Sequence, residues 1–234
     1  MARVIDEGLS KRELEDVIDK DDFSKYGNAL TNFSSQLSTN QSLLAMNVLK
    51  DPYRLDFVTL ERGYDEHDLE SAIAKDITRF LLELGSGFTY VGRQPEFVVG
   101  NEGYFPDLLF YHIRLRCYVV IELKVVDFKP EFAGKLNFYV TACNKLLRQP
   151  EDNPTIGLLL CKSKDQTKVE WAFDSIRNPM GVATYEGIKI KDKLPSVEDL
   201  KKRLDMVEQE LREYKENEEA SNKEDTDDSN QKTE

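Results

Sequence analysis

The stretch GYFPDLLFYHIRLRCYVVIELKVVDF, residues 103–128, decides the fold of this chain. Most of it is apolar and suited to buried β-strands. Three ionisable side chains nevertheless interrupt the apolar runs, namely Asp107, Glu122 and Lys124. Buried charges are costly unless they are paired or hold a metal ion, so these three residues need a reason to be there.

The spacing of the three charges predicts that they meet. Alternate strand residues point the same way, so Glu122 and Lys124 should leave one face of a strand, about 6–7 Å apart. Residues 112–116 are expected to turn the chain, so that Asp107 begins a paired strand and approaches Glu122. Two carboxylates that close raise each other's pKa unless a cation lies between them. A divalent ion with oxygen ligands would resolve this conflict.

A strong amphipathic helix is predicted before this stretch. In DEHDLESAIAKDITRFLLELGSG, residues 65–87, Asp65 is expected to cap a single helix that ends at Gly85, with Asp68 three positions after the cap. The apolar residues recur at helical spacing. Glu70 lies at the border of that apolar stripe, from which its carboxylate can reach the same cluster.

Each charge also has an ordinary structural interpretation. Asp107 would suit a turn, Glu122 and Lys124 would suit an ion pair at a sheet end, and Glu70 would suit a solvated helix face. Taken alone, each of these simpler interpretations is the more frequent one. The joint occurrence of the four charged residues favours a shared site instead, because FPD is followed by IELK and then by a helix.

The remaining central elements indicate an α/β fold. A helix is predicted over residues 130–149, and NPTIGLLLCK is typical of a fully buried strand. KVEWAF is interpreted as another strand. Helices on both sides of these strands predict a mixed sheet flanked by helices. The other predicted strands are Phe88–Gly92, Glu96–Val99, Pro106–Tyr111 and Cys117–Val126.

The two ends of the chain differ from the α/β domain predicted for residues 65–195. Residues 1–64 are predicted to be a helical segment and linker, with a helix from Ser10, a polar linker SSQLSTNQS and a short helix before an Asp-Pro pair. Residues 196–217 carry a short heptad pattern, which indicates either a surface helix on its own domain or a coiled-coil dimer. Residues 218–234 are a charged tail expected to be disordered.

Composition narrows the class of protein. The chain has 234 residues, three cysteines without a CxxC pair, and no apolar run as long as a membrane span. The N-terminal residues lack the apolar region of a secretion signal, and with the odd cysteine count this predicts a cytoplasmic protein with reduced thiols. His67 and His112 lie far from any cysteine pair, which argues against a structural zinc site.

The net charge of −12 is unusual for a protein that binds nucleic acid, but the acid is concentrated in the ends of the chain. Residues 66–195 contain 17 basic and 18 acidic side chains. A nearly neutral domain can carry a local basic groove, although it gains little long-range attraction for phosphates.

Pro106-Asp107 and Glu122-Leu123-Lys124 resemble the PD-(D/E)xK motif of the restriction-endonuclease-like superfamily. The blocks DLESAIAKDITRFLLELGSGFTYVGRQ, FPDLLFYHIRLRCYVVIELK, FKPEFAGKLNFYV and DNPTIGLLLCK extend this resemblance to the YhcG-type family of PD-(D/E)xK nucleases. The resemblance implies a restriction-endonuclease-like mixed sheet flanked by helices. Family members usually carry a larger helical domain ahead of the nuclease domain, and residues 1–64 look like its remnant.

The resemblance also implies a metal-dependent phosphodiesterase. Asp107 and Glu122 would ligate Mg²⁺, with Mn²⁺ as an alternative ion and the Leu123 backbone carbonyl as a further ligand. Lys124 would orient the attacking water and stabilise the charge that develops on the phosphate. Glu70 matches the helix acid that supports such sites.

Further expectations concern the nucleic acid itself. Gln94 and Arg93 are expected to contact the substrate or the site, and Asn137 and Tyr139 are candidates on the helix after the lysine. A basic path for the phosphate backbone is expected from Arg93, Arg114, Arg116, Lys129, Lys135 and Arg148, with a solvated surface as the alternative for at least half of them.

These features predict a Mg²⁺-dependent nuclease whose partner is nucleic acid, with DNA favoured over RNA, in repair, recombination or defence against foreign DNA. The alternative is a catalytically silent nuclease fold that binds nucleic acid and acts with a partner. A third interpretation, a homo-oligomer held by the C-terminal helix, depends on the heptad pattern alone.

Overall fold

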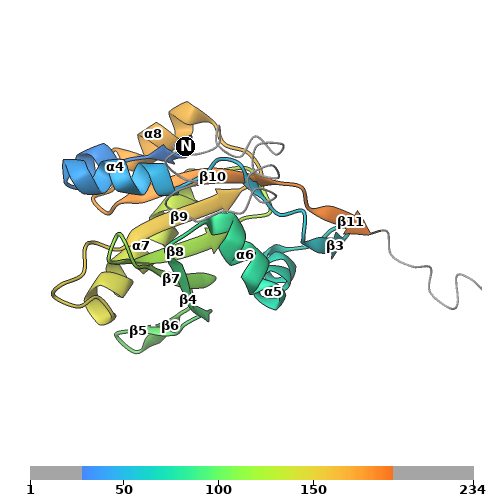
Figure 1. Cartoon of the computed structure of the whole chain (residues 1–234), viewed down its shortest axis with the longest axis horizontal. Helices are drawn as coiled ribbons and strands as arrows, with labels where there is room; N and C mark the ends of the chain where they lie inside the picture. Colours follow the sequence, from blue (N-terminus) through green and yellow to red (C-terminus); the bar gives the residue numbers. More distant parts are fainter. Residues whose placement is uncertain (1–27, 192–234) are drawn as a thin grey trace, which may run out of the picture. The chain divides into compact units, whose positions relative to one another are not determined.

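The computed structural model describes residues 28–191, through which a mixed β-sheet runs (Figure 1). Its seven strands follow the order β1-β10-β9-β8-β7-β4, and β2 also pairs with β10. The strands are β1 (Leu30–Thr31), β2 (Tyr53–Arg54), β4 (Phe88–Arg93), β7 (Leu108–His112), β8 (Cys117–Leu123), β9 (Ile156–Cys161) and β10 (Met180–Glu186).

Both pairing directions occur in this sheet. β8, β9 and β10 are parallel neighbours, whereas β4 with β7 and β7 with β8 are antiparallel. The predicted hairpin is confirmed, because His112 lies opposite Cys117 at the closed end of the β7–β8 pair. Two smaller sheets join β3 (Thr59–Glu61) to β11 (Lys189–Lys191) and β5 (Phe97–Val99) to β6 (Glu102–Tyr104).

Helices cover both faces of the sheet and create two hydrophobic cores. The first core receives residues of α3 (Phe33–Gln36), α4 (Thr39–Val48), α5 (Glu66–Lys75) and α6 (Ile77–Leu84), and the second receives residues of α7 (Pro130–Leu146) and α8 (Gln166–Phe173). Strand side chains alternate, so Ile121 of β8 enters the first core and Val120 enters the second. The prediction of a mixed sheet flanked by helices is therefore confirmed.

The predicted single helix after Asp65 is two helices. Asp65 caps α5 as expected, since its side chain accepts from the Asp68 amide and the Asp68 side chain accepts from the Asp65 amide. The helix is interrupted at Asp76, whose backbone is not helical (φ −122°, ψ 49°). The prediction missed the break because Ile73 and Phe80 are seven residues apart and remain on one buried face across it.

The described part of the predicted N-terminal segment, residues 28–64, belongs to the same sheet. β1 pairs with β10 with Leu30 opposite Val182, and β2 pairs with β10 with Tyr53 opposite Tyr185. The short helix predicted before Asp51-Pro52 is confirmed as α4, whereas these two strands were not predicted. The stretch SSQLSTNQS is also mostly helical, because α3 and α4 include most of it.

Two other strand predictions need correction. KVEWAF lies in the helix α8, which Asp165 caps and which buries Val169 and Phe173, four residues apart, while Trp171 is exposed. β8 ends at Leu123, so Lys124 lies just beyond the strand rather than inside it. The heptad segment 196–217, the tail 218–234 and the helix predicted from Ser10 lie outside the described residues.

All three cysteines are buried and unpaired. Burial raises the pKa of Cys117, Cys143 and Cys161 to about 12 in each case. Thiolates are the reactive form of cysteine, so these side chains act as small apolar core residues. No helix within residues 28–191 has the length and apolar character needed to cross a membrane.

Candidate active site

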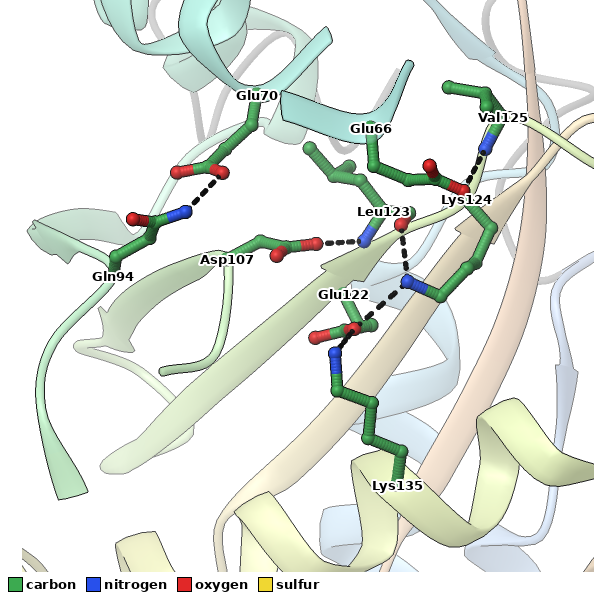
Figure 2. A network of polar contacts seen from close by, with 9 residues as sticks. All are labelled: Glu66, Glu70, Gln94, Asp107, Glu122, Leu123, Lys124, Val125 and Lys135. Atoms are coloured by element: carbon green, nitrogen blue, oxygen red, sulfur yellow. Dashed lines mark hydrogen bonds and ion pairs between the residues drawn. The ribbon is translucent and has the colours of Figure 1, made fainter. Parts of the chain in front are cut away.

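Glu122 is the centre of a polar network at the end of β8 (Figure 2). Its side chain is fully buried and belongs to the strand residues that face α7. Oε1 of Glu122 accepts hydrogen bonds from two ammonium groups, Lys124 Nζ at 3.0 Å and Lys135 Nζ at 2.6 Å. Oε2 is buried and has no hydrogen-bond partner among the described residues. One carboxylate oxygen is thus doubly paired while the other is left open.

Asp107 lies beside Glu122, one residue before the neighbouring strand β7 begins. The register of the β7–β8 hairpin, in which Leu108 faces Ile121, puts Asp107 opposite Glu122. Its Oδ2 accepts a hydrogen bond from the Leu123 amide at 2.7 Å. Burial, and after it the charge of Glu122, raises the pKa of Asp107 to about 7. The charge of Glu122 therefore disfavours the ionised form of Asp107.

Lys124 is held firmly although it follows the end of β8. Its amide donates to the Leu160 carbonyl of β9, and its carbonyl accepts from the Tyr185 hydroxyl of β10 at 3.0 Å. Its ammonium group also donates to the Leu123 carbonyl at 2.9 Å. Two neighbouring strands thus fix the backbone from which this lysine reaches the carboxylate.

Glu70 approaches the end of the sheet from α5, and Figure 2 shows Asp107 between Glu70 and Glu122. Its buried carboxylate accepts from Arg93 Nε at 2.6 Å and from Gln94 Nε2 at 2.7 Å. The backbone N–H of Gln94 also donates to the backbone carbonyl oxygen of Asp107 at 2.9 Å. Gln94 has a positive φ of 43°, an uncommon backbone conformation that often occurs at functional sites. Gln94 therefore links the Glu70 carboxylate to the backbone of Asp107.

A family model described as the YhcG PDDEXK nuclease domain matches residues 46–205, a span that contains all four of these ionisable residues. The chain belongs to this nuclease family. The match also begins before β2, in agreement with the strands that residues 28–64 contribute to the sheet.

A curated relative supports the same family. It is described as "Putative nuclease YhcG" of Escherichia coli (strain K12) and is 35% identical over 144 residues. The aligned region covers 62% of this chain but only 38% of that protein. The chain therefore spans well under half the length of this relative.

Two solved structures show a weaker likeness. One, "Structure of EndoMS-dsDNA2 complex", has a TM-score of 0.35 and 15% identity over 56% of this chain and 45% of that chain. The other, a repair endonuclease from Pyrococcus abyssi, has a TM-score of 0.33 and 17% identity over 57% and 50%. The family assignment rests on the sequence match and not on these low scores.

Two of the residues predicted to contact the substrate, Arg93 and Gln94, reach the candidate active site, because both donate hydrogen bonds to Glu70. Asn137 and Tyr139 are the other two. Of these two candidates on α7, Tyr139 reaches the network through Lys135, whereas Asn137 does not. The Asn137 side chain accepts from Asn178 Nδ2 at 2.8 Å, and Tyr139 is buried with its ring 5.2 Å from Lys135 Nζ.

Lys135 is the residue of α7 that contacts Glu122 itself, and it was predicted only as part of a basic path. Burial lowers the pKa of Lys135, but the hydrogen bond and the charge of Glu122 outweigh this and raise the pKa overall. No sequence signal identified Lys135 as the partner of Glu122, because their contact depends on how α7 packs against β8.

The predicted basic path is not continuous. Arg114 and Arg116 lie at the turn of the β7–β8 hairpin, the end opposite Asp107 and Glu122. Arg148 donates from Nε to the Asp152 carbonyl at 3.1 Å, also away from the network. Only Arg93 and Lys135 of the six predicted cations contact the site residues, so any cationic path for a phosphate backbone is local to this end of the sheet.

The donor atoms of the network suit a hard divalent cation. Within residues 28–191, no three His, Cys, Asp or Glu side chains converge in a metal-binding arrangement. The available ligands are instead two carboxylates, Asp107 and Glu122, and the Leu123 carbonyl. Mg²⁺ commonly uses one or two carboxylates and keeps several waters, so this set fits it. The unpartnered Oε2 of Glu122 is the observation that favours such an ion.

Proposed function

We propose that this domain is a metal-dependent nuclease that hydrolyses phosphodiester bonds of DNA, in repair, recombination or defence against foreign DNA. The observation that carries the proposal is the state of Glu122, whose buried carboxylate has two lysines on one oxygen and nothing on the other, beside a second carboxylate. Most buried polar side-chain atoms have a hydrogen-bond partner, so the unpartnered Oε2 of Glu122 needs an explanation that a plain ion pair does not give. The membership in the YhcG PDDEXK nuclease family agrees with this proposal.

In this proposal Asp107, Glu122 and the Leu123 carbonyl hold Mg²⁺ or Mn²⁺. When bound, the ion lowers the pKa of a coordinated water and offsets charge on the phosphate. The raised pKa of Asp107 supports this assignment, because burial and the charge of Glu122 disfavour its ionised form and a bound cation would favour it.

The two lysines would have different roles, Lys124 toward the attacking water and Lys135 toward the phosphate. Lys124 Nζ lies between the Glu122 carboxylate and the Leu123 carbonyl, so it is placed to orient the attacking water beside the ligands. Lys135 is about half exposed, so its ammonium can bind a phosphate oxygen that arrives from solvent. Each adds a positive point charge where the phosphate gains negative charge during hydrolysis.

Glu70 would act through its neighbours. It fixes Arg93 and Gln94, and Gln94 in turn contacts the backbone of Asp107. We therefore assign Glu70 and Gln94 as positioning residues. Arg93 is partly exposed and would also attract the nucleic-acid backbone.

The test is a cleavage panel of single-stranded, branched and duplex DNA with Mg²⁺ or Mn²⁺. We expect products from the full chain, none with EDTA, and none from Asp107→Ala or Lys124→Ala. Lys145→Ala, which removes an exposed lysine at the far end of α7, should cleave normally. Equal cleavage by Lys124→Ala and the parent protein, or cleavage that resists EDTA, would refute the assignment.

The alternative function is a nuclease fold that binds nucleic acid without turnover. The net charge of −12 favours a dependence on a partner, because negative charge opposes binding to the phosphate backbone. Retention of DNA without metal and without product would support this alternative.

A further inference from the structure

Tyr104 and Phe138 pack together where the β5–β6 hairpin meets α7, and the ring of Phe105 lies against Gly103 of the same hairpin. We call Tyr104, Phe105 and Phe138 the aromatic patch. The rings of Tyr104 and Phe138 lie 4.7 Å apart between centroids. Phe105 is 47% exposed and Phe138 is 37% exposed, although large aromatic side chains are usually more deeply buried. The patch therefore offers ring surface to a ligand from solvent.

The backbone below the patch is firmly supported. Phe97 of β5 is buried in the core formed with α7, and Tyr104 packs against the same core. β5 and β6 pair with Phe97 opposite Tyr104. Tyr104 and Phe138 thus lie on a paired strand and on a helix, and Phe105 follows directly after β6.

The aromatic patch adjoins the candidate active site on both of its elements. Phe105 is two residues before Asp107, at most about 7 Å between Cα atoms. Phe138 is three residues after Lys135 on α7, one turn of helix or roughly 5 Å along the axis. Both aromatic residues are thus within about one nucleotide of groups assigned to the metal and the phosphate.

The charges around the patch disfavour a phosphate as its ligand. The hairpin carries Glu96 and Glu102, and the Tyr104 hydroxyl donates to Glu102 Oε2 at 2.8 Å. Positive charge lies instead on the side of the active site, at Lys124 and Lys135. This distribution of charge suits a ligand whose phosphate binds the two lysines and whose uncharged planar group contacts the aromatic patch.

Building on the proposed function, we propose that the aromatic patch stacks unpaired nucleobases beside the bond to be cut, so that the substrate is single-stranded or frayed DNA. Bases in an intact duplex already stack on their neighbours and cannot offer a face to Phe105 or Phe138, whereas single strands bind proteins by such stacking.

The test measures binding in EDTA, so that it does not depend on cleavage. The probes are a fluorescent single strand of about twelve thymidines, an abasic strand with the same phosphates, and a duplex of the same length. Full-length protein should bind the thymidine strand at least about fivefold more tightly than the abasic strand. Phe105→Leu and Phe138→Leu should lose most of this difference and bind the abasic strand unchanged.

Trp171→Leu is the matched control, since Trp171 is an exposed aromatic residue on α8, an element that carries none of the site residues. It should bind both strands as the parent protein does. Equal binding of thymidine and abasic strands, or no binding of either, overturns the inference. So does an equal loss on both strands in the Phe variants, which would indicate general damage.

The outcome is separable from that of the proposed function. Base-dependent binding without any metal-dependent product would leave the inference standing and remove the nuclease proposal. Metal-dependent cleavage at equal rates on duplex and single-stranded DNA, unchanged in Phe105→Leu, would support the nuclease proposal and overturn the inference about the aromatic patch.

Discussion

Two carboxylates at the site, the buried Glu122 and the partly buried Asp107, are held there at a cost to the stability of the folded protein. Glu122 is fully buried, and the two lysines on its Oε1 offset part of the cost of burying it. Asp107 has no such cation of its own; only the Leu123 amide contacts its carboxylate in the described structure. The fold therefore tolerates an ionised Asp107 at the expense of stability, and this can be measured.

Asp107→Asn should stabilise the metal-free protein near pH 8. The pKa of Asp107 rises from 3.8 to about 7 on folding, so the folded state holds more protons between these values and stability falls as pH rises through that window. Asparagine keeps an oxygen for the Leu123 amide but carries no charge. We expect a gain of about 1–3 kcal/mol in the free energy of unfolding at pH 8 and none below about pH 4.

Urea denaturation in EDTA at the two pH values would measure this gain. Asp127→Asn, which removes an exposed aspartate, is the control and should change little at either pH. A gain of the same size at both pH values would mean that the charge of Asp107 is not its source.

Residue spacing was sufficient to predict which strand residues meet. The separation of Glu122 from Lys124 and the hairpin register of Asp107 depend on local geometry, which a sequence displays. The contact of Lys135 with Glu122 depends instead on how α7 crosses β8, and no periodicity in either element encodes that crossing. The same holds for the contact of Glu70 with Gln94, between a helix and the end of a strand.

At the scale of elements, the distance between α7 and β9 sets the position of Lys135. Gly157 of β9 lies directly beneath α7, and a Cβ atom there would be 2.8 Å from Val140 Cγ2 and 3.0 Å from Leu136 Cγ. Real side chains essentially never approach this closely, so the helix rests on a site where only glycine fits. Leu136 adjoins Lys135 in the chain, so a shift of α7 also moves the lysine.

Gly157→Ala and Gly134→Ala should therefore have opposite effects. Gly157→Ala should cost about 1–3 kcal/mol through overpacking and should also slow cleavage, because α7 would move away from Glu122. A Cβ at Gly134, in α7 itself, meets nothing within 4 Å, so alanine there should stabilise the helix by up to about 1 kcal/mol.

Thermal denaturation and the cleavage assay would measure both variants. The interpretation fails if the two alanines change the unfolding free energy in the same direction.

Element predictions succeeded where one pattern dominated. α7 and the fully buried β9 were predicted because Pro130 starts the helix and the strand is apolar throughout. α8 was mistaken for a strand because its two buried residues are few and its exposed Trp171 is apolar. β10 was not predicted, although it is buried along most of its length and has partners on both edges.

At the scale of the whole molecule, β10 joins the two ends of the described chain. β1 and β2 come from its start and share β10 with β9, which belongs to the middle. Phe33 is fully buried in the same core as Phe80 and Phe110. Residues 28–64 should therefore unfold together with the nuclease-family sheet.

Phe33→Ala tests this cooperativity. We expect a loss of about 3–5 kcal/mol in the unfolding free energy, because a large buried ring is removed from the common core. Leu43→Ala, at a residue of α4 that is 57% exposed, should cost less than about 0.5 kcal/mol.

The fluorescence of Trp171, the single tryptophan, would report unfolding from α8, far from Phe33 in sequence. Were residues 28–64 an independent segment, the Trp171 transition would be the same in Phe33→Ala and the parent protein.

The burial of all three thiols makes the native chain a ready background for site-specific labelling. Cys117, Cys143 and Cys161 are shielded from reagents, and their high pKa values keep thiolate scarce at neutral pH. A single cysteine introduced at the exposed Val98 of β5 would then be the fast-reacting thiol. A dye or spin label attached there could follow a DNA strand at the hairpin without any cysteine first being removed.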